Sequence, residues 1–162
     1  MLDEGTAQGK AYRWLVSRDL AQLCPLDDNM YQRYTLAVLY YETDERQTWT
    51  SCYVGDPGCG SAGSAFAGSE AYLSSASECR WAGVTCSNDV VVLLNIPSNG
   101  LGGIIPPEIS LGLSGIELMN LNGNEIGGTV PALPKVLTDL NLSGNRLSGT
   151  LDDIIRGSTM IR

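Results

Sequence analysis

Five cysteines carry the clearest chemistry in this sequence, and they stand at positions 24, 52, 59, 79 and 86. The chain has no histidine, so the cysteines suit a zinc site poorly, and catalytic triads built on histidine are excluded. So many cysteines instead favour disulfide chemistry in an oxidising compartment. Because five is an odd number, one thiol stays free or pairs outside the chain, and counting leaves the pairing of the others open.

Two adjacent carboxylates, Asp27 and Asp28, are candidates for a hydrolase in the N-terminal region. Both precede a helical pattern that begins at Met30, and aspartate is a preferred helix N-cap. We therefore interpret them, together with Asn29, as helix caps. The sequence predicts no enzyme, no metal site and no cofactor.

The charge pattern argues against several classes of partner. Lys and Arg total 10 and Asp and Glu total 18, which gives a net charge of −8. Since the acidic excess is spread along the chain without a basic patch, we expect neither nucleic acid nor an anionic membrane as partner. Apolar runs such as Val90 to Leu94 are too short to span a bilayer. The start, MLDEGTAQGK, lacks the apolar region of an export signal, so we expect that signal and any membrane anchor in segments outside this chain.

Two predicted helices come first among the elements that position these residues. One is expected from Thr6, its cap, to Leu23, and the other, MYQRYTLAVLYYET, over Met30–Thr43. Cys24-Pro25 separates them. Residues 48–77 are rich in Gly, Ser and Ala, which predicts irregular structure with a short helix around Ala67 to Leu73. The expected apolar sides are Ala11, Trp14, Leu15 and Leu20 in the first helix, and Met30, Tyr34, Ala37, Val38 and Tyr41 in the second.

After Cys86 the sequence repeats itself in the frame LxLxxNxLxGxIP. The copies are LLNIPSNGLGGIIP, MNLNGNEIGGTVP and LNLSGNRLSGTLD, where Asp152 replaces the last proline. In LxL both apolar side chains should point inward from a short strand, while the residue between them points outward. Three residues before each LxL stands a further apolar anchor, at Val91, Ile116 and Leu137. The spacing of the repeat asparagines falls in the range of leucine-rich repeats, which predicts stacked turns with a parallel sheet.

The repeat asparagines Asn99, Asn124 and Asn145 are expected to be structural. Each amide can bond backbone groups that the tight turn leaves unpaired, and an unsatisfied buried group costs about 1–3 kcal/mol. Gly103, Gly128 and Gly149 are expected where a Cβ would hinder the backbone conformation or a close approach. Residues 152–162 begin another turn and stop before its LxL, so we expect a piece of a longer array with an open end at Leu147, Leu151, Ile154 and Ile155.

The LxGxIP motif resembles the plant-type leucine-rich repeat, and CRWAGVTC, residues 79–86, resembles the CxWxGVxC element that ends the N-terminal cap of such proteins. QRYTLAVLYYET, with Trp49, Cys52 and Cys59 after it, further resembles leucine-rich repeat proteins of diatoms. The resemblance implies an α/β fold, namely a right-handed solenoid with a short parallel sheet on its concave face behind a mainly helical cap. It implies a cap over 1–88 and about three repeats, C-terminally truncated, over 89–162.

Several residue roles follow from this resemblance. The two cysteines of CxWxGVxC are bonded in that family, which implies a Cys79–Cys86 disulfide, and Trp81 corresponds to the tryptophan that plugs the first turn. Proximity along the chain then makes Cys52–Cys59 the second expected pair and Cys24 the unpaired thiol.

The resemblance also implies a ligand surface, because such proteins bind peptides, proteins or glycans through outward residues of the concave sheet. Asn95, Asn120 and Asn141 should form a polar column. Asn141-Leu142-Ser143 is the one N-x-S/T triplet, so Asn141 is also a glycosylation candidate, and a glycan there would cover the third strand. With Ser98 standing in for Pro97, the predicted ligand-binding residues are Leu93, Asn95, Ser98, Leu118, Asn120, Asn122, Asp139, Asn141 and Ser143.

Two functions remain open at this point. The first is an extracellular or cell-surface recognition module, secreted or part of a receptor-like protein, that binds a protein, peptide or glycan. The second is a structural or adhesive component of a wall or surface, in which the sheet face is merely solvated and the repeats act as a spacer.

Overall fold

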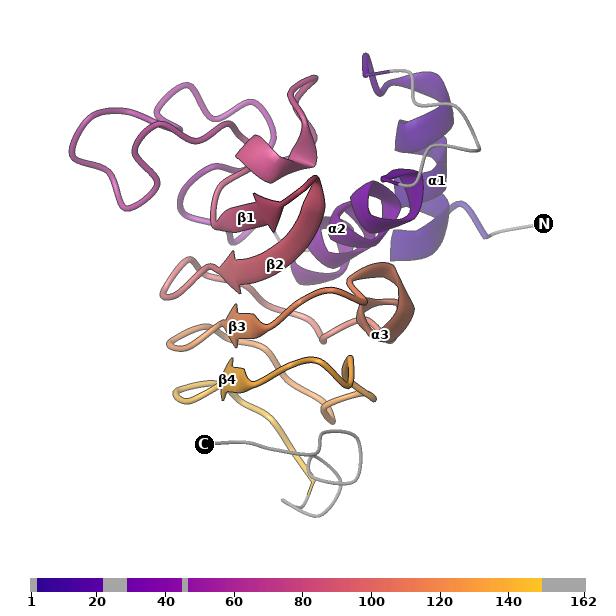
Figure 1. Cartoon of the computed structure of the whole chain (residues 1–162), viewed down its shortest axis with the longest axis vertical. Coiled ribbons are helices and arrows are strands. Elements are labelled where there is room, and N and C mark those ends of the chain that lie inside the picture. The colour runs from indigo at the N-terminus through magenta and orange to yellow at the C-terminus, as the bar shows by residue number, and fades with distance from the viewer. Residues whose placement is uncertain (1–2, 22–28, 45–46, 150–162) are drawn as a thin grey trace.

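A computed structural model of the chain describes residues 3–21, 29–44 and 47–149, and its architecture is α/β (Figure 1). None of the described helices has the length and apolar character needed to cross a membrane. The predictions for Cys24, Asp27, Asp28, Leu151 and residues 152–162 lie outside the described residues. In chain order the elements are α1 (Ala7–Ser17), α2 (Met30–Thr43), the 3-10 helix η1 (Glu78–Arg80), β1 (Val84–Ser87), β2 (Val90–Asn95), α3 (Ile109–Gly112), β3 (Leu118–Asn120) and β4 (Asp139–Asn141).

Helix α1 begins as predicted and ends earlier than predicted. The Thr6 hydroxyl caps it by accepting from the backbone N–H of Gly9 at 3.1 Å. At the other end the Trp14 carbonyl accepts from the N–H groups of both Arg18 and Asp19, and the chain turns so that the Asp19 side chain enters the interior. This turn leaves Leu20 78% exposed, so its predicted place on the apolar side of the helix is wrong.

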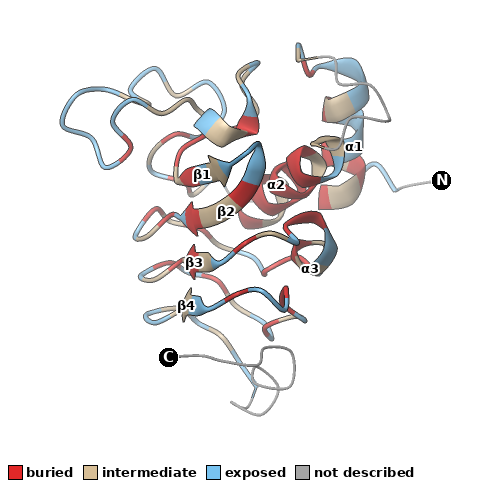
Figure 2. Ribbon diagram, in the orientation of Figure 1, coloured by how far each residue is buried: buried red, intermediate tan, exposed pale blue. Residues whose placement is uncertain are grey.

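Helix α2 has the predicted bounds but a wider buried surface than predicted (Figure 2). Ala37 and Val38 are buried as expected, whereas Tyr34 and Tyr41 are only partly buried. Asn29 precedes the helix but makes no side-chain cap hydrogen bond, which corrects its predicted role. The apolar stripe was too narrow a prediction because α2 lies in the middle of the molecule, and its buried residues are Gln32, Arg33, Thr35, Leu36, Ala37, Val38, Leu39, Tyr40 and Thr43.

The segment 47–77 is irregular, as predicted, but the short helix expected around Ala67 to Leu73 is absent from it. Tertiary pairing replaces the local hydrogen bonds that a helix would need. Glu70 pairs with the segment around Trp81, and the N–H of Tyr72 donates to the Cys52 carbonyl at 3.0 Å. Contacts with residues distant in the sequence therefore override the helix propensity of this segment.

Four strands form one sheet in the order β1-β2-β3-β4 (Figure 1). Strands β2, β3 and β4 are parallel, as the repeat frame predicts, and three residues of each strand pair with the residues at the same frame positions in the next turn. Strand β1 was not predicted. It runs antiparallel to β2 through a two-residue turn at Asn88 and Asp89, which have φ of 48° and 62°, and such left-handed turn residues are typical of a tight hairpin.

The inward residues of the repeats form a continuous core with the helices. In the first two turns the LxL pairs are Leu94 with Ile96 and Met119 with Leu121, and each of these side chains is fully buried. In the third turn Leu140 and Leu142 are partly buried. The anchors before each LxL are buried as predicted. The short helix α3, which the sequence analysis missed, packs on α2 so closely that a Cβ on Gly112 would meet the Thr35 hydroxyl.

The end of α2 and the loop that follows it lie against the first repeat in the way that one repeat lies against the next. The N–H of Gly102 donates to the Thr43 carbonyl at 2.9 Å. Gly103 has a φ of 60°, and a Cβ there would lie 2.0 Å from the Glu42 carbonyl oxygen, so glycine is required on both grounds. The N-terminal region thereby covers what would otherwise be an open end of the repeat core.

Two disulfides staple this N-terminal region, one between Cys52 and Cys59 and the other between Cys79 and Cys86. They are the two pairs named from the sequence. The second bond ties η1 to β1 and so flanks Trp81. Trp81 is fully buried against the rings of Trp14 and Tyr72, at centroid distances of 5.8 and 5.3 Å.

Replacing both Cys79 and Cys86 by serine should lower the free energy of unfolding by about 2.5 kcal/mol, the chain-entropy value for a closed loop of this length. Urea denaturation followed by tryptophan fluorescence would measure the loss. The matched variant C52S/C59S opens a loop of the same sequence separation, 7 residues, so the chain-entropy model predicts a similar loss for it. Unchanged unfolding of the Cys79/Cys86 variant would contradict the prediction.

Candidate binding surface on the sheet

Two rows of outward side chains cross the parallel strands. In the first row Leu93 of β2 pairs with Leu118 of β3, and Leu118 pairs with Asp139 of β4. In the second row Asn95, Asn120 and Asn141 are paired in the same way. The structure thus brings together the outward residues predicted from different turns because every repeat presents the same frame position to the same face.

The three asparagines form a polar column in which the side chains of Asn95 and Asn120 are hydrogen-bonded to each other. The Nδ2 of Asn120 donates to the Oδ1 of Asn95 at 2.8 Å. The Oδ1 of Asn141 accepts from both the backbone N–H and the hydroxyl of Ser143, at 3.2 and 2.7 Å. Asn122 donates its backbone N–H to the Oδ1 of Asn120 at 3.3 Å. Asn95 and Asn141 are exposed, so the column leaves amide groups open to a partner.

The first row is partly apolar. Leu93 and Leu118 are half-buried and adjacent, which places a small apolar patch beside the asparagine column. Thr85 of β1 is exposed and pairs with Leu93, so it extends this row by one strand. The sequence analysis missed Thr85 because β1 was not predicted. At the other end of the row, the Asp139 carboxylate is exposed and accepts from the Thr138 hydroxyl at 2.8 Å.

Ser98, the polar residue chosen in place of its neighbour Pro97, is exposed in the turn that follows β2. Its φ is 49°, and the next two turns have glycines with φ of 70° at the equivalent positions, Gly123 and Gly144. Ser98 is therefore the residue that reverses the chain after β2, and its hydroxyl lies over Gly123, where a Cβ would be 2.6 Å away. Pro97 is the true counterpart of Asn122 and Ser143 in the repeat frame.

An asparagine ladder supports the surface from inside, as predicted. The Oδ1 of Asn124 accepts from the N–H groups of Asn99 and Leu101 at 2.9 and 3.1 Å. Its Nδ2 donates to the carbonyls of Ile96 and Leu121 at 2.8 and 2.9 Å. Asn145 repeats this pattern one turn later. In the first turn Asn99 bonds Thr50 and Ser51, so the loop after α2 replaces a preceding repeat.

A buried charge cluster that the sequence analysis missed joins the helices to the sheet. Arg33 of α2 is 1% exposed, and its Nε and Nη2 donate to the two carboxylate oxygens of Asp19 at 2.6 and 2.7 Å. Its remaining N–H groups reach Glu78 Oε2 at 3.2 Å and the carbonyls of Ser74 and Ala76. All five donors of the guanidinium are thus used.

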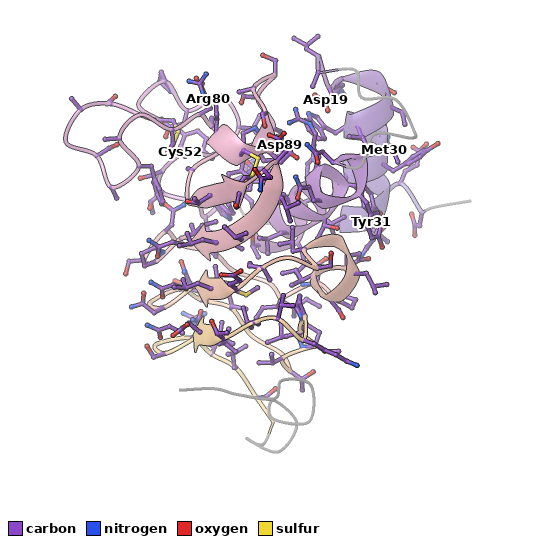
Figure 3. All side chains as sticks on the ribbon, in the orientation of Figure 1. Asp19, Met30, Tyr31, Cys52, Arg80 and Asp89 are labelled. Carbon is purple, nitrogen blue, oxygen red and sulfur yellow. A yellow bond between two sulfur atoms is a disulfide. The ribbon has the colours of Figure 1, made fainter. Side chains whose placement is uncertain are left out.

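The ring of Trp81 and the side-chain amide of Gln32 also contact this cluster. The Arg33 guanidinium carbon lies 4.7 Å from the centroid of Trp81, a cation–π contact. Gln32 donates to Glu78 Oε1 and to the Asp89 carbonyl, both at 2.7 Å, which ties the start of β2 to α2. Figure 3 labels Asp19, which follows α1, and Asp89, which lies in the β1–β2 turn. Arg33 is the one charged residue between Met30 and Tyr41 of α2, and this was the sequence signal for the cluster.

No group of histidine, cysteine and carboxylate side chains suited to hold a metal occurs among the residues that the structure describes.

The comparisons with known proteins agree with this repeat geometry. The family model for the Leucine Rich Repeat matches residues 136–158. The receptor-like kinase TMK4 of Arabidopsis thaliana is 32% identical over 73 residues, which are 44% of this chain and 8% of that protein. The protein STRUBBELIG-RECEPTOR FAMILY 1 of the same plant is 36% identical over 77 residues, 45% of this chain and 9% of that protein.

These matches support a plant-type leucine-rich repeat protein. A third relative, the brassinosteroid LRR receptor kinase BRL3 of Oryza sativa subsp. japonica, is 31% identical over 96 residues, which are 55% of this chain and 8% of that protein. The chain therefore spans less than about a tenth of the length of these relatives, whose shares are 8% and 9%.

Two solved structures are similar to this chain. The BIR3–SERK2 complex from Arabidopsis thaliana matches with a TM-score of 0.45 and 29% identity, over 53% of this chain and 52% of that chain. The BIR2 ectodomain from the same plant matches with a TM-score of 0.39 and 23% identity, over 73% of this chain and 69% of that chain.

Proposed function

We propose that the chain is an extracellular or cell-surface recognition module, secreted or part of a receptor-like protein. In this proposal residues 1–88 form the N-terminal cap, and residues 89–162 begin a right-handed leucine-rich repeat solenoid whose concave face binds a protein, peptide or glycan. The further resemblance to diatom leucine-rich repeat proteins, based on QRYTLAVLYYET, belongs to the same proposal. Binding is its activity, and no catalytic step is assigned to it.

The observation that carries this proposal is the alignment of outward residues across β2, β3 and β4. Open amides of the asparagine column stand beside the leucine pair Leu93 and Leu118. A surface that mixes directional hydrogen-bond groups with a small apolar patch suits recognition of a polypeptide. The two disulfides suit an oxidising compartment. The matched relatives bear the names of receptor-like kinases and receptors, which supports a receptor-like setting.

Within this proposal Asn141 remains the predicted glycosylation acceptor. Its side chain is exposed on β4 and engages Ser143 of the same triplet. A glycan at Asn141 would cover the third strand and confine the binding surface to β2 and β3.

The test is a triple substitution on the sheet face, Asn95→Ala with Leu118→Ala and Asp139→Ala. Partners captured from the cell surface by the immobilised wild-type chain would be identified, and their affinities would then be measured for each variant. We expect a loss of at least about tenfold, or about 1.4 kcal/mol of binding free energy. All three side chains lie outside the core, so we expect the variant to fold. Circular dichroism would verify this.

A matched control replaces three exposed residues outside the strands, with Ser114→Ala, Thr129→Ala and Lys135→Ala. This variant should bind as the wild type does. If the sheet-face variant also binds like the wild type, specific recognition by this face is wrong, and the structural or adhesive role becomes the better interpretation.

A further inference from the structure

Helix α1 lies at the side of the molecule opposite the loops that follow the strands (Figure 1). Cationic side chains of α1 and of Arg18, the residue at its end, line a hollow. The hollow has a volume of about 140 Å³, and its lining residues are Lys10, Arg13, Trp14, Arg18 and Tyr41. Lys10, Arg13 and Trp14 are three and four positions apart in α1, so their side chains lie on one face of the helix, and Arg18 caps its end. Tyr41 comes from α2, which packs against α1.

Three cationic side chains line the hollow in a chain whose net charge is −8. No carboxylate is among its lining residues. Arg13 pairs with Glu4 at 2.6 Å, whereas Lys10 and Arg18 have no ion pair in the described parts of the chain. Burial raises the pKa of the Tyr41 hydroxyl, and the nearby guanidinium groups of Arg18 and Arg13 act in the opposite direction. The guanidinium groups of Arg13 and Arg18 therefore both lie near the Tyr41 hydroxyl.

A second hollow of about 250 Å³ adjoins the first, because Lys10 and Tyr41 line both. Its other lining residues are Gly5, Thr6, Ala7, Gln8 and Glu42 at the start of α1 and the end of α2. Backbone, hydroxyl, amide and carboxylate groups make this hollow polar, with Lys10 as its single cation. A cationic hollow sized for one anionic group thus opens beside a larger polar hollow, with a tyrosine between them.

We propose that this face of α1 binds an anionic carbohydrate. A sulfate ester or carboxylate would lie between Lys10, Arg13 and Arg18, where charge-assisted hydrogen bonds favour it. A sugar ring would pack on Tyr41, and its hydroxyl groups would enter the second hollow. Three cations in an acidic protein are too few to hold a nucleic-acid backbone. The site lies on the helices and not on the sheet, so it extends the proposed function without depending on it.

The experiment is a titration of the whole, disulfide-bonded chain with a sulfated tetrasaccharide prepared from heparin, followed by backbone amide resonances and by calorimetry. We expect shifts confined to residues 5–18 and 41–42. The same tetrasaccharide without sulfate should bind at least about tenfold more weakly, because the charge-assisted contacts are lost. Equal binding of the desulfated sugar, or shifts on β2 to β4 instead of α1, would overturn the proposal, and so would binding to phosphatidylserine vesicles alone.

Two pairs of variants sharpen this test. Lys10→Gln and Arg18→Gln should each weaken binding about fivefold, which corresponds to one exposed ion pair. The control Lys135→Gln removes one exposed cation far from α1 and should leave binding unchanged. Tyr41→Phe should keep the affinity and Tyr41→Leu should lower it, since the ring is the contact. An equal loss in Lys135→Gln would mean attraction by net charge alone and would sink the idea.

Discussion

Replacing Arg33 by methionine is expected to lower the free energy of unfolding by about 3–5 kcal/mol, the cost of breaking a buried ion pair from one side. Methionine fills a similar volume but leaves the carboxylates of Asp19 and Glu78, whose side chains are 0% and 3% exposed, without their cation. The carbonyls of Ser74 and Ala76 lose their donors as well. Thermal unfolding should shift downward by roughly 6–20 °C for a chain of this size.

The exposed pair of Arg13 and Glu4 provides the control. Their side chains are 46% and 80% exposed, so Arg13→Met should cost less than about 1 kcal/mol. A second variant, R33M combined with D19L and E78Q, removes the orphaned charges and should recover much of the lost stability. If Arg33→Met unfolds at the same urea concentration as Arg13→Met, the cluster does not hold the helices to the sheet.

The Asn124→Ala variant is expected to lose about 3–4 kcal/mol of stability, the second largest effect. Four backbone groups, the N–H groups of Asn99 and Leu101 and the carbonyls of Ile96 and Leu121, would lose their partner. Each unsatisfied group costs about 1–3 kcal/mol, and entry of water offsets part of the sum. Urea denaturation, with hydrogen exchange at the Asn99 and Leu101 amides, would measure the global and the local effect.

Alanine variants of two other asparagines serve as comparisons for this prediction. Asn145→Ala should cost less than Asn124→Ala, because Asn145 is only partly buried. Asn120 lies in the outward column, so Asn120→Ala should stay within about 0.5 kcal/mol of the wild type. If the Asn120 and Asn124 variants lose equal stability, the distinction between structural and surface asparagines is wrong.

The periodic part of the fold could be predicted from the sequence because the same residue pattern recurs in each repeat and specifies the strand and the turn. The alternation in LxL gives the inward and outward residues, and the aligned asparagines give the turns. Ser98 was chosen as the polar neighbour of Pro97, which holds the frame position of Asn122 and Ser143. The sequence did not reveal that Ser98 has a positive φ and reverses the chain, as Gly123 and Gly144 do in the next two turns.

The rest of the fold could not be predicted because it depends on contacts between residues that are distant in the sequence. Helix α1 ends early because Asp19 turns inward to Arg33, and the segment 67–73 is not helical because it pairs with Trp81 and Cys52. Lys10, Arg13 and Arg18 are three cations in a chain with an acidic excess, so the sequence analysis did not recognise them as a basic patch. Folding gathers them around Tyr41, and such a local grouping is visible only when the helix packing is known.

Strand β1 has a consequence for how this protein behaves at high concentration. The outer edge of a parallel sheet presents unpaired backbone groups that can recruit other chains into fibrils or tangled oligomers. Here β1 occupies that edge of β2, and β1 itself is only four residues long, with a register shift between Thr85 and Cys86. Such a short, irregular strand is a poor template for pairing. Opening the bond between Cys79 and Cys86 would remove the covalent tie of β1 to η1, so we expect reducing conditions to promote aggregation before they promote complete unfolding.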